Sequence, residues 1–404
     1  MNNSGAEIVV GIPSYNNART IGNVVKAVDA GLAKYFPRKK ALIVNSDGGS
    51  KDGTSEIVKT AAIDRKALLM LHPLSMSHRI STPYHGIPGK GSAIKTIFKK
   101  AVAMGADACA VVDSDLRSIT PEWIELLLKP VMSAGFDFVA PLYSRHKFDG
   151  TITNSIVYPM TRALYGKRIR QPIGGEFGFS RKLMEHYLGQ DVWDTDVARF
   201  GIDIWMTTEA IANGFNICQA FLGAKIHDPK DPSSDLGNML VQVVGSLFEL
   251  TKKHSDVWKT INHTDDVDTF GFNYYVAPEH VKVDVGRMLL TYREGLKNLH
   301  EIWIEVMGRG DFSELRAHSA VNDDEFRFPQ GLWARIVYDF AISYKKRKLP
   351  QQQLIKSLLP LYLGKTASFV MEVSDKSQEE AEAEIEKLCL KFEETKTHLV
   401  NGWK

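Results

Sequence analysis

Two carboxylates follow a short apolar run near the middle of the chain. Residues 110–112 are Ala-Val-Val, and Asp113, Ser114 and Asp115 come directly after them. Acids at i and i+2 after a buried strand supply hard oxygen ligands that suit Mg²⁺ or Mn²⁺ beside a diphosphate. A solvated turn is the alternative interpretation. The choice depends on which other polar residues reach the same place.

Two further polar groups follow other predicted strands. Asp47 can accept hydrogen bonds from a nucleobase or a ribose. Lys90 lies between Gly89 and Gly91, so it offers a positive charge to phosphate on a backbone that a ligand can approach closely. Taken alone, Lys90 could be a solvated loop lysine. Together with Asp47 and the Asp113/Asp115 pair, it favours a nucleotide site.

A histidine from a distant predicted strand is the next candidate ligand. His227 follows a strand and lies between Lys225 and Lys230 in a proline-containing loop. We expect His227 to complete the metal site and both lysines to meet phosphate, although a lone loop histidine is commonly a surface residue. Asp196 and Asp228 are expected to be solvated.

The elements that position these residues alternate between strand and helix. Apolar strands are predicted at 8–13, 41–44, 67–71 and 110–112, with helices from 20, 54, 92 and 121 and a long loop up to residue 91. Such alternation predicts an α/β fold with a doubly wound parallel sheet. Because ligands bind at the carboxyl ends of such strands, Pro13, Asp47, Gly89 and Asp113 should share one crevice.

The second half of the chain is predicted to become mainly helical. A helix over 201–213, a strand over 217–222 and a helix over 236–253 precede a polar stretch at 255–272, and helices follow to the end. We therefore predict a first domain over 1–254, with its nucleotide half ending near 140, and a helical C-terminal region over 273–404. These helices could serve internal packing, homodimer formation or both.

The composition is that of an ordinary globular protein. Hydrophobic residues make up 44% of the 404 positions and charged residues 24%, and the net charge is +2. This balance gives no reason to expect nucleic acid or a membrane as partner, and no apolar run is long enough to span one. Cys109, Cys218 and Cys389 are expected to be reduced and structural. The first residues lack the pattern of a signal peptide, so a cytoplasmic location is expected.

Several motifs together resemble a known family. The matching segments are residues 13–17, 47–54, 88–91, 113–116, 171–176 and 222–227. They are similar to those of nucleotide-sugar-dependent glycosyltransferases with the Rossmann-like GT-A fold. Among these, the retaining glucosyl-3-phosphoglycerate synthases resemble the chain most, and mannosylglycerate synthase less.

The resemblance implies a metal-dependent retaining transfer of glucose or mannose. The donor would be a UDP- or GDP-hexose, the metal Mg²⁺ or Mn²⁺, and the acceptor the 2-hydroxyl of glycerate or 3-phosphoglycerate. Implied donor contacts are Pro13, Tyr15, Asn17, Asp47, Lys90, Asp113, Ser114, Asp115, Lys225 and Lys230, and the implied metal ligands are Asp115, His227 and Asp113. Glu176 and Asp203 would serve catalysis at the donor sugar, and the implied acceptor contacts are Gly150, Thr151, Thr153, Gly174 and Gly175.

Two positions depart from the family pattern. Asn17 stands where these enzymes usually carry a glutamate that contacts the nucleotide. Thr151 follows Gly150 where phosphoglycerate-using members carry an arginine, so Arg145, Lys147 or Lys230 would have to grip a phosphate. Both the donor base and the phosphorylation of the acceptor therefore stay open.

Two other functions are compatible with the same residues. A sugar-phosphate nucleotidyltransferase shares the alternating fold and the two-acid metal site, but the first strand lacks the glycine-rich basic loop that would follow it. A sugar-nucleotide-binding protein without activity would use the helical region for partners. A nucleotidyltransferase would release pyrophosphate, and a binding protein would form no product, so the products distinguish both from a glycosyltransferase.

Overall fold

The computed structural model describes residues 5–61, 78–84, 87–226, 236–272 and 281–404. The chain forms two compact units that interleave along the sequence. The sheet unit comprises 1–144, 169–229 and 267–278, and the helical unit comprises 145–168, 230–266 and 279–404. The predicted domains, 1–254 and 273–404, stay a prediction, and by compactness residues 145–168 and 230–266 group with the C-terminal helices.

The sheet unit holds one mixed sheet of eight strands in the described part of the chain. The strands are β1 (Ile8–Ser14), β2 (Ala41–Asp47), β3 (His78–Pro83), β4 (Ala108–Val111), β5 (Phe138–Ser144), β6 (Phe177–Ser180), β7 (Ile217–Ala224) and β8 (Thr269–Phe270). Their order is β3-β2-β1-β4-β6-β5-β7-β8. Only β6 runs antiparallel to its neighbours among these strands, β4 on one side and β5 on the other. The fold is the predicted Rossmann-like α/β arrangement.

The third strand differs from the prediction. The expected range 67–71 lies outside the described residues, and the strand that pairs with β2 is β3, within the stretch predicted as a loop. β3 is an edge strand and carries the sequence HRISTP, whose described side chains are partly exposed or exposed. An edge strand needs no continuous apolar run, so its pattern is weak.

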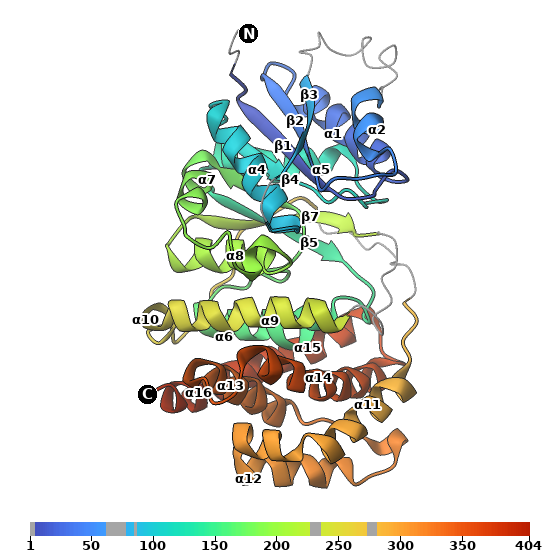
Figure 1. Cartoon of the computed structure of the whole chain (residues 1–404), viewed down its shortest axis with the longest axis vertical. Helices are drawn as coiled ribbons and strands as arrows, with labels where there is room; N and C mark the ends of the chain where they lie inside the picture. Colours follow the sequence, from blue (N-terminus) through green and yellow to red (C-terminus); the bar gives the residue numbers. More distant parts are fainter. Residues whose placement is uncertain (1–4, 62–77, 85–86, 227–235, 273–280) are drawn as a thin grey trace. The chain divides into compact units, whose positions relative to one another are not determined.

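Helices cover both faces of the sheet (Figure 1). α1 (Ile21–Tyr35) and α5 (Pro121–Ala134) pack together over one face, against Ile8, Val10 and Ile12. α4 (Lys90–Ala103) packs over the other face with α7 (Arg181–Leu188). A Cβ at Gly11 would meet Ile97 of α4 at 2.4 Å, so this glycine permits the close approach of helix and strand. The remaining helices of the unit are α2 (Thr54–Thr60), α8 (Ile202–Ala212) and the short 3₁₀ turn η2 (Asp196–Ala198).

The helical unit is built around a buried arginine and long apolar helices. Its elements are η1 (Thr153–Val157), α6 (Tyr158–Tyr165), α9 (Leu236–Lys253), α10 (Ser255–Trp258), α11 (Val285–Asn298), α12 (His300–Ser319), η3 (Asp323–Glu325), α13 (Gln330–Lys346), α14 (Gln351–Val373), α15 (Gln378–Glu394) and α16 (Lys396–Gly402). Arg162 of α6 is fully buried and pairs with Glu386 and Glu393 of α15. These pairs join the early segment to the C-terminal helices of the same unit.

The sequence predictions about the cysteines and the C-terminal helices agree with the structure. Cys109, Cys218 and Cys389 are buried and form no disulfide. The region after residue 280 is helical apart from its connections. Across the described ranges, no helix combines the length and the apolar character needed to cross a membrane.

Candidate functional site

Three strand ends bring charged side chains to one place in the sheet unit. Because β6 runs antiparallel to β4, the end of β4 lies beside the start of β6, with Val111 opposite Phe177. Asp113 therefore follows β4 close to Glu176, which precedes β6. Lys225 arrives directly after β7, two strands further along the sheet.

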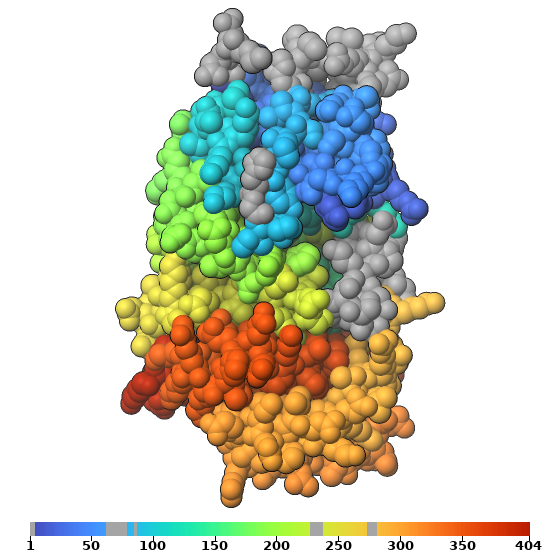
Figure 2. Space-filling model, in the orientation of Figure 1, coloured from blue at the N-terminus to red at the C-terminus, as the bar shows by residue number. Residues whose placement is uncertain are grey.

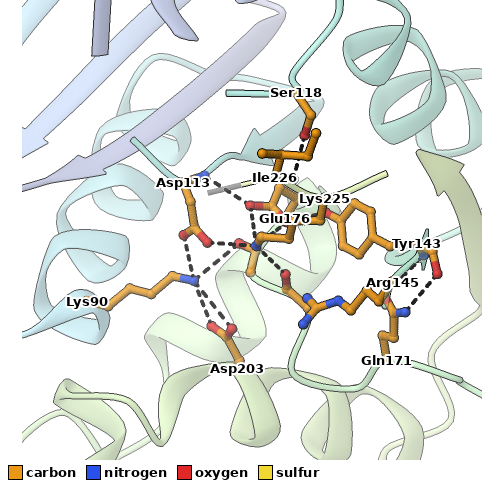
Figure 3. Close-up of polar contacts among 12 residues, drawn as sticks. Lys90, Asp113, Ser118, Tyr143, Arg145, Gln171, Glu176, Asp203, Lys225 and Ile226 are labelled. Carbon is orange, nitrogen blue, oxygen red and sulfur yellow. Dashed lines mark hydrogen bonds and ion pairs between the residues drawn. The ribbon is translucent and has the colours of Figure 1, made fainter. Parts of the chain in front are cut away.

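Lys225 lies at the centre of this group (Figure 3). Its ammonium is 2.9 Å from both carboxylate oxygens of Glu176 and 3.1 Å from Asp113 Oδ2. It also donates to the carbonyl of Gly174 at 2.8 Å. Glu176, fully buried, accepts further hydrogen bonds from the Tyr143 hydroxyl and from the backbone N–H of Asp113. In this arrangement Glu176 holds Lys225 and the strand end in place.

Lys90 joins a second acid to the group (Figure 3). Its ammonium lies 2.9 Å from Asp113 Oδ1 and 3.3 Å from Asp203 Oδ2, and it donates to the carbonyl of Gly175. Asp203 lies in the first turn of α8, and its buried Oδ1 is also paired with the Lys90 ammonium, at 3.2 Å. We call Lys90, Asp113, Glu176, Asp203 and Lys225 the acid–lysine cluster. Three carboxylates against two ammonium groups leave it one negative charge in excess when all are ionised.

Burial and charge act against each other in the cluster. Burial would raise the pKa of Asp113, but Lys90 and Lys225 outweigh it and hold that pKa well below its usual range. Burial raises the pKa of Glu176 to about 7 and also raises the pKa of Asp203, with the lysines opposing both shifts. Asp113 is therefore the most firmly ionised of the three acids.

The two glycines before Glu176 make room for the cluster. Gly175 has a φ of +98°, and a Cβ there would lie 2.4 Å from Asp113 Oδ2 and 2.7 Å from Lys225 Nζ. A Cβ at Gly174 would collide with Pro141. Both carbonyl groups are hydrogen-bonded by the lysines. The predicted role of these glycines in acceptor binding stays a prediction, and their described neighbours are the cluster itself.

Asp115 differs from Asp113 in having no partner. Its side chain is half-buried and makes no hydrogen bond or ion pair with any described residue. The described residues also contain no group of three side chains able to hold a metal. Mg²⁺ typically takes one or two carboxylates together with water and substrate phosphate, so a lone available carboxylate beside a diphosphate fits such an ion. Of the two other predicted metal ligands, Asp113 is paired with Lys90 and Lys225. His227 lies outside the described residues, as does Lys230, a predicted phosphate contact.

The Asp113–Asp115 turn is held by the loop after β1. The Ser114 hydroxyl donates to Asn17 Oδ1 at 2.8 Å, and the Thr20 hydroxyl donates to the Ser114 carbonyl at 2.8 Å. Asn17 also accepts from the N–H of Tyr15. Thr20 does stand at the start of α1 as predicted, but its hydroxyl makes no helix cap because it is used on Ser114. Asn17 thus positions the acidic turn, a role that its sequence position alone did not reveal.

Other predicted nucleotide contacts lie at the ends of β1 and β2. Pro13 is buried in β1, opposite Ser46 of β2, whereas Tyr15 is 63% exposed. Asp47 accepts hydrogen bonds from Ser50 and Ser55, at 2.6 Å from each hydroxyl. Asp47 therefore organises the loop before α2, and its contact with a nucleobase stays a prediction.

Gly89 and Gly91 are close to protein backbone. A Cβ at Gly89 would lie 2.4 Å from the carbonyl oxygen of Ala198, and one at Gly91 would lie 1.9 Å from that of Val197. These glycines let the start of α4 pack against η2, which carries the chain to Asp203. Their described role is to bring Lys90 and Asp203 together, and no ligand is needed to explain them.

The predicted acceptor loop, Gly150 with Thr151 and Thr153, belongs to the helical unit. Gly150 has a φ of +65°, and Thr153 is buried at the start of η1. Of the basic residues proposed to grip a phosphate, Lys147 is engaged by three backbone carbonyl groups and Arg145 pairs with Asp149.

Tyr143 is the residue of the site that the sequence did not single out. It ends the apolar strand β5, donates to Glu176, and lies under the Lys225 ammonium, 5.5 Å from its ring centre. Gln171 fixes its backbone with two hydrogen bonds of 3.1 Å. An aromatic residue in an apolar strand carries no signal of such a role, because it is equally expected in the core.

Comparison with known proteins identifies the family of this chain. Residues 20–248 match the family described as the mannosylglycerate synthase glycosyltransferase (GT) domain, which is more than half of the chain. The chain belongs to this family. The mannosylglycerate synthase family model thus covers the acid–lysine cluster and ends before the C-terminal helices.

Two curated relatives are similar to this family member. The glucosyl-3-phosphoglycerate synthase of Mycolicibacterium smegmatis is 26% identical over 263 residues, covering 61% of this chain and 78% of its own. The enzyme of the same name from Petrotoga mobilis is 26% identical over 265 residues, covering 61% and 71%. A solved structure of glucosyl-3-phosphoglycerate synthase from Mycobacterium tuberculosis, with Mg²⁺ and UDP, has 22% identity and a TM-score of 0.45, covering 61% of this chain and 80% of that one.

These findings confirm the predicted resemblance, the GT-A fold class and the assignment as a hexosyltransferase. The roles of the individual site residues stay predictions.

Proposed function

We propose that this enzyme is a metal-dependent retaining hexosyltransferase. It transfers glucose or mannose from a UDP- or GDP-hexose to the 2-hydroxyl of glycerate or 3-phosphoglycerate. The observation that carries the proposal is the pairing of an available carboxylate, Asp115, with a buried acid–lysine cluster at the ends of β4, β6 and β7. Membership of the mannosylglycerate synthase family and the names of the curated relatives support the same reaction class.

A divalent ion would be held by Asp115, with His227 as the second predicted ligand. When bound, such an ion neutralises charge on a departing diphosphate and so stabilises the transition state. In the reaction, the bond between the anomeric carbon and the diphosphate oxygen breaks, and a bond to the acceptor oxygen forms. The acceptor proton passes to the departing diphosphate.

The protein's own groups arrange the donor. Lys90 and Lys225 place two positive charges at the strand ends, and Glu176 and Tyr143 keep Lys225 from moving. Asp203, held by Lys90 at the start of α8, is the acid that we assign to a hydroxyl of the donor sugar. We assign Glu176 to positioning because both of its oxygens are already engaged.

We also propose that the enzyme is a cytoplasmic homodimer. Light scattering of the purified protein measures the state directly. A measured mass of one chain at micromolar concentration would contradict the proposed dimer, and it would not bear on the proposed reaction.

A donor-by-acceptor screen tests the activity. UDP-glucose, GDP-glucose and GDP-mannose are each combined with glycerate and 3-phosphoglycerate in buffer containing Mg²⁺ or Mn²⁺, and nucleoside diphosphate release is followed. The proposal predicts release that depends on both the acceptor and the metal. Release of pyrophosphate from a sugar phosphate and a nucleoside triphosphate would favour the nucleotidyltransferase instead.

A further inference from the structure

The acceptor loop runs into an unusual helical turn. Residues Thr153–Val157 form the π-helical turn η1, which continues directly into α6. A π turn has i→i+5 backbone hydrogen bonds in place of the i→i+4 bonds of an α-helix, and such turns occur frequently at functional sites. The polar groups around this turn therefore need partners from elsewhere in the helical unit.

One partner comes from the middle of α14. The hydroxyl of Tyr362 is 2.5 Å from the hydroxyl of Thr151, the residue directly after Gly150. Tyr362 is completely buried. This short hydroxyl–hydroxyl contact restrains the Thr151 side chain, because the buried Tyr362 hydroxyl has no solvent as an alternative partner.

Two further contacts hold the same segment from both sides. Trp333 of α13 donates its indole N–H to the carbonyl of Ser155, within the π turn, at 2.7 Å. Before the loop, the Lys147 ammonium is 2.7 Å from each of three carbonyl oxygens at the end of α14, those of Val373, Ser374 and Lys376. We call the contacts of Lys147, Thr151 and Ser155 with α13 and α14 the loop brace.

The helices that supply the brace lie outside the family match. The match ends at residue 248, and α13 and α14 begin at Gln330 and Gln351. Figure 2 shows the segments after residue 280, coloured light orange to red, as one continuous region of the visible surface. The loop conformation thus depends on segments of this chain that the shared domain does not include.

We propose that Tyr362 is a positioning residue for the acceptor, which fixes the hydroxyl of Thr151 and so determines how tightly the small hydroxy acid binds. The inference rests on the proposed function, since it takes residues 150–153 as the acceptor loop. It assigns part of the acceptor specificity to α14. A lost hydrogen bond of this kind is worth about 1 kcal/mol, which corresponds to about a fivefold change in binding.

The test compares two buried tyrosines of the helical unit. Tyr362→Phe removes the contact with Thr151, and Tyr292→Phe removes an equivalent hydroxyl–hydroxyl contact of 2.6 Å with Ser319, far along the sequence from the loop. Steady-state kinetics with acceptor and donor varied separately, and isothermal titration with glycerate and with 3-phosphoglycerate, are measured for both. Tyr362→Phe should raise the acceptor KM and Kd about fivefold with the donor KM within twofold, and Tyr292→Phe should change neither.

Substitutions at the loop itself provide the second arm. Thr151→Val should raise the acceptor Kd at least as much as Tyr362→Phe, and adding Tyr362→Phe to it should cause no further rise. An acceptor Kd of Tyr362→Phe equal to that of wild type overturns the inference, as does an equal rise in Tyr292→Phe, which would indicate general loosening. If wild type binds neither acid, the proposed function fails first and the inference fails with it.

Discussion

The acid–lysine cluster and the loop brace each hold candidate functional residues in place, but they do so with different interactions. The cluster fixes its members by charge: two ammonium groups bridge three carboxylates at the ends of the sheet's strands. The brace fixes the acceptor loop with hydroxyl, indole and carbonyl groups supplied by helices that lie about 180 to 230 residues later.

The two regions differ in whether the match to the glycosyltransferase domain covers them. The cluster lies wholly within the matched residues 20–248, whereas the brace needs α13 and α14. Lysines and a metal-binding carboxylate at strand ends suit the diphosphate that a UDP- or GDP-hexose carries. Directional hydrogen bonds to a loop suit the selection of one small acceptor among many.

The largest expected effect concerns the carboxylate left available beside the cluster. Asp115→Ala should lower kcat/KM by about 1,000-fold, equivalent to about 4 kcal/mol, because it removes the carboxylate that we propose as a metal ligand. The matched control is Asp196→Ala, which removes an exposed carboxylate of the same unit. A coupled assay of nucleoside diphosphate release measures kcat/KM for both variants. Near-normal transfer by Asp115→Ala in metal-replete buffer would contradict the proposal that Asp115 binds the metal.

Breaking the cluster should cost stability as well as activity. Lys225→Met leaves the buried Glu176 carboxylate without its ammonium partner, and the free energy of unfolding should fall by about 3 to 4 kcal/mol. The double variant Lys225→Met/Glu176→Gln should recover part of this loss, since residue 176 no longer carries a charge that needs Lys225. Urea unfolding measures both, and a loss below about 1 kcal/mol in the single variant would mean that the ion pair does not hold the strand ends together.

The cluster and the brace also differ in how far the sequence could predict them. The predicted parallel sheet placed Asp113 and the loop of Lys90 at one edge, whereas Glu176 was implied only by the family resemblance, and the antiparallel β6 that brings it there was not predicted. The sequence did not indicate that the lysines would be engaged by the acids, because that depends on distances between side chains. Nor did it reveal Tyr143, which looks like any core aromatic.

The brace was beyond sequence reasoning for a physical reason. Tyr362 and Trp333 lie in apolar helical patterns, where an aromatic side chain is expected simply to fill the core. Only the packing of α13 and α14 shows that their polar atoms meet Thr151 and Ser155. Edge strand β3 was missed for a related reason, since partial exposure removes the apolar run that marks a strand.

A buried lysine in α14 gives a test of the helical unit alone. Lys365 is almost fully buried and donates to the carbonyl of Phe328, and burial lowers its pKa to about 8, with Glu372 and Glu384 opposing the shift. Below pH 8 both states are protonated and the folded state bears the full cost of burying the charge. Between about pH 8 and 10.5 the unfolded state binds more protons, so stability should rise with pH.

Replacing this lysine should therefore stabilise the unit. Lys365→Met should raise the free energy of unfolding at pH 7 by up to about 3 kcal/mol, from 1.36 kcal/mol for each tenfold change in proton affinity, and should flatten the rise above pH 8. The control is Lys356→Met, which removes an exposed lysine of the same helix. Urea unfolding at pH 7 and pH 9.5 gives both values, and destabilisation by Lys365→Met would show that its ammonium serves the fold.

The smallest expected effect concerns the residue that replaces the family's glutamate. Asn17→Ala removes the acceptor of the Ser114 hydroxyl, so the acidic turn should loosen and the donor KM should rise about fivefold, for a loss of about 1 kcal/mol. Asn23→Ala, at an exposed position of α1, is the matched control. An unchanged donor KM would mean that Thr20 alone holds the turn.

The most direct test of the central claim is the anomeric configuration of the product. The wild-type enzyme is incubated with UDP-glucose, glycerate or 3-phosphoglycerate, and Mn²⁺, and the new glycosidic signal is followed by NMR from the first minutes. A retaining hexosyltransferase of this family should give an α-linked product at the 2-hydroxyl, formed only when both the acceptor and the metal are present. A β-linked product, or UDP release that does not depend on any acceptor, would contradict the account.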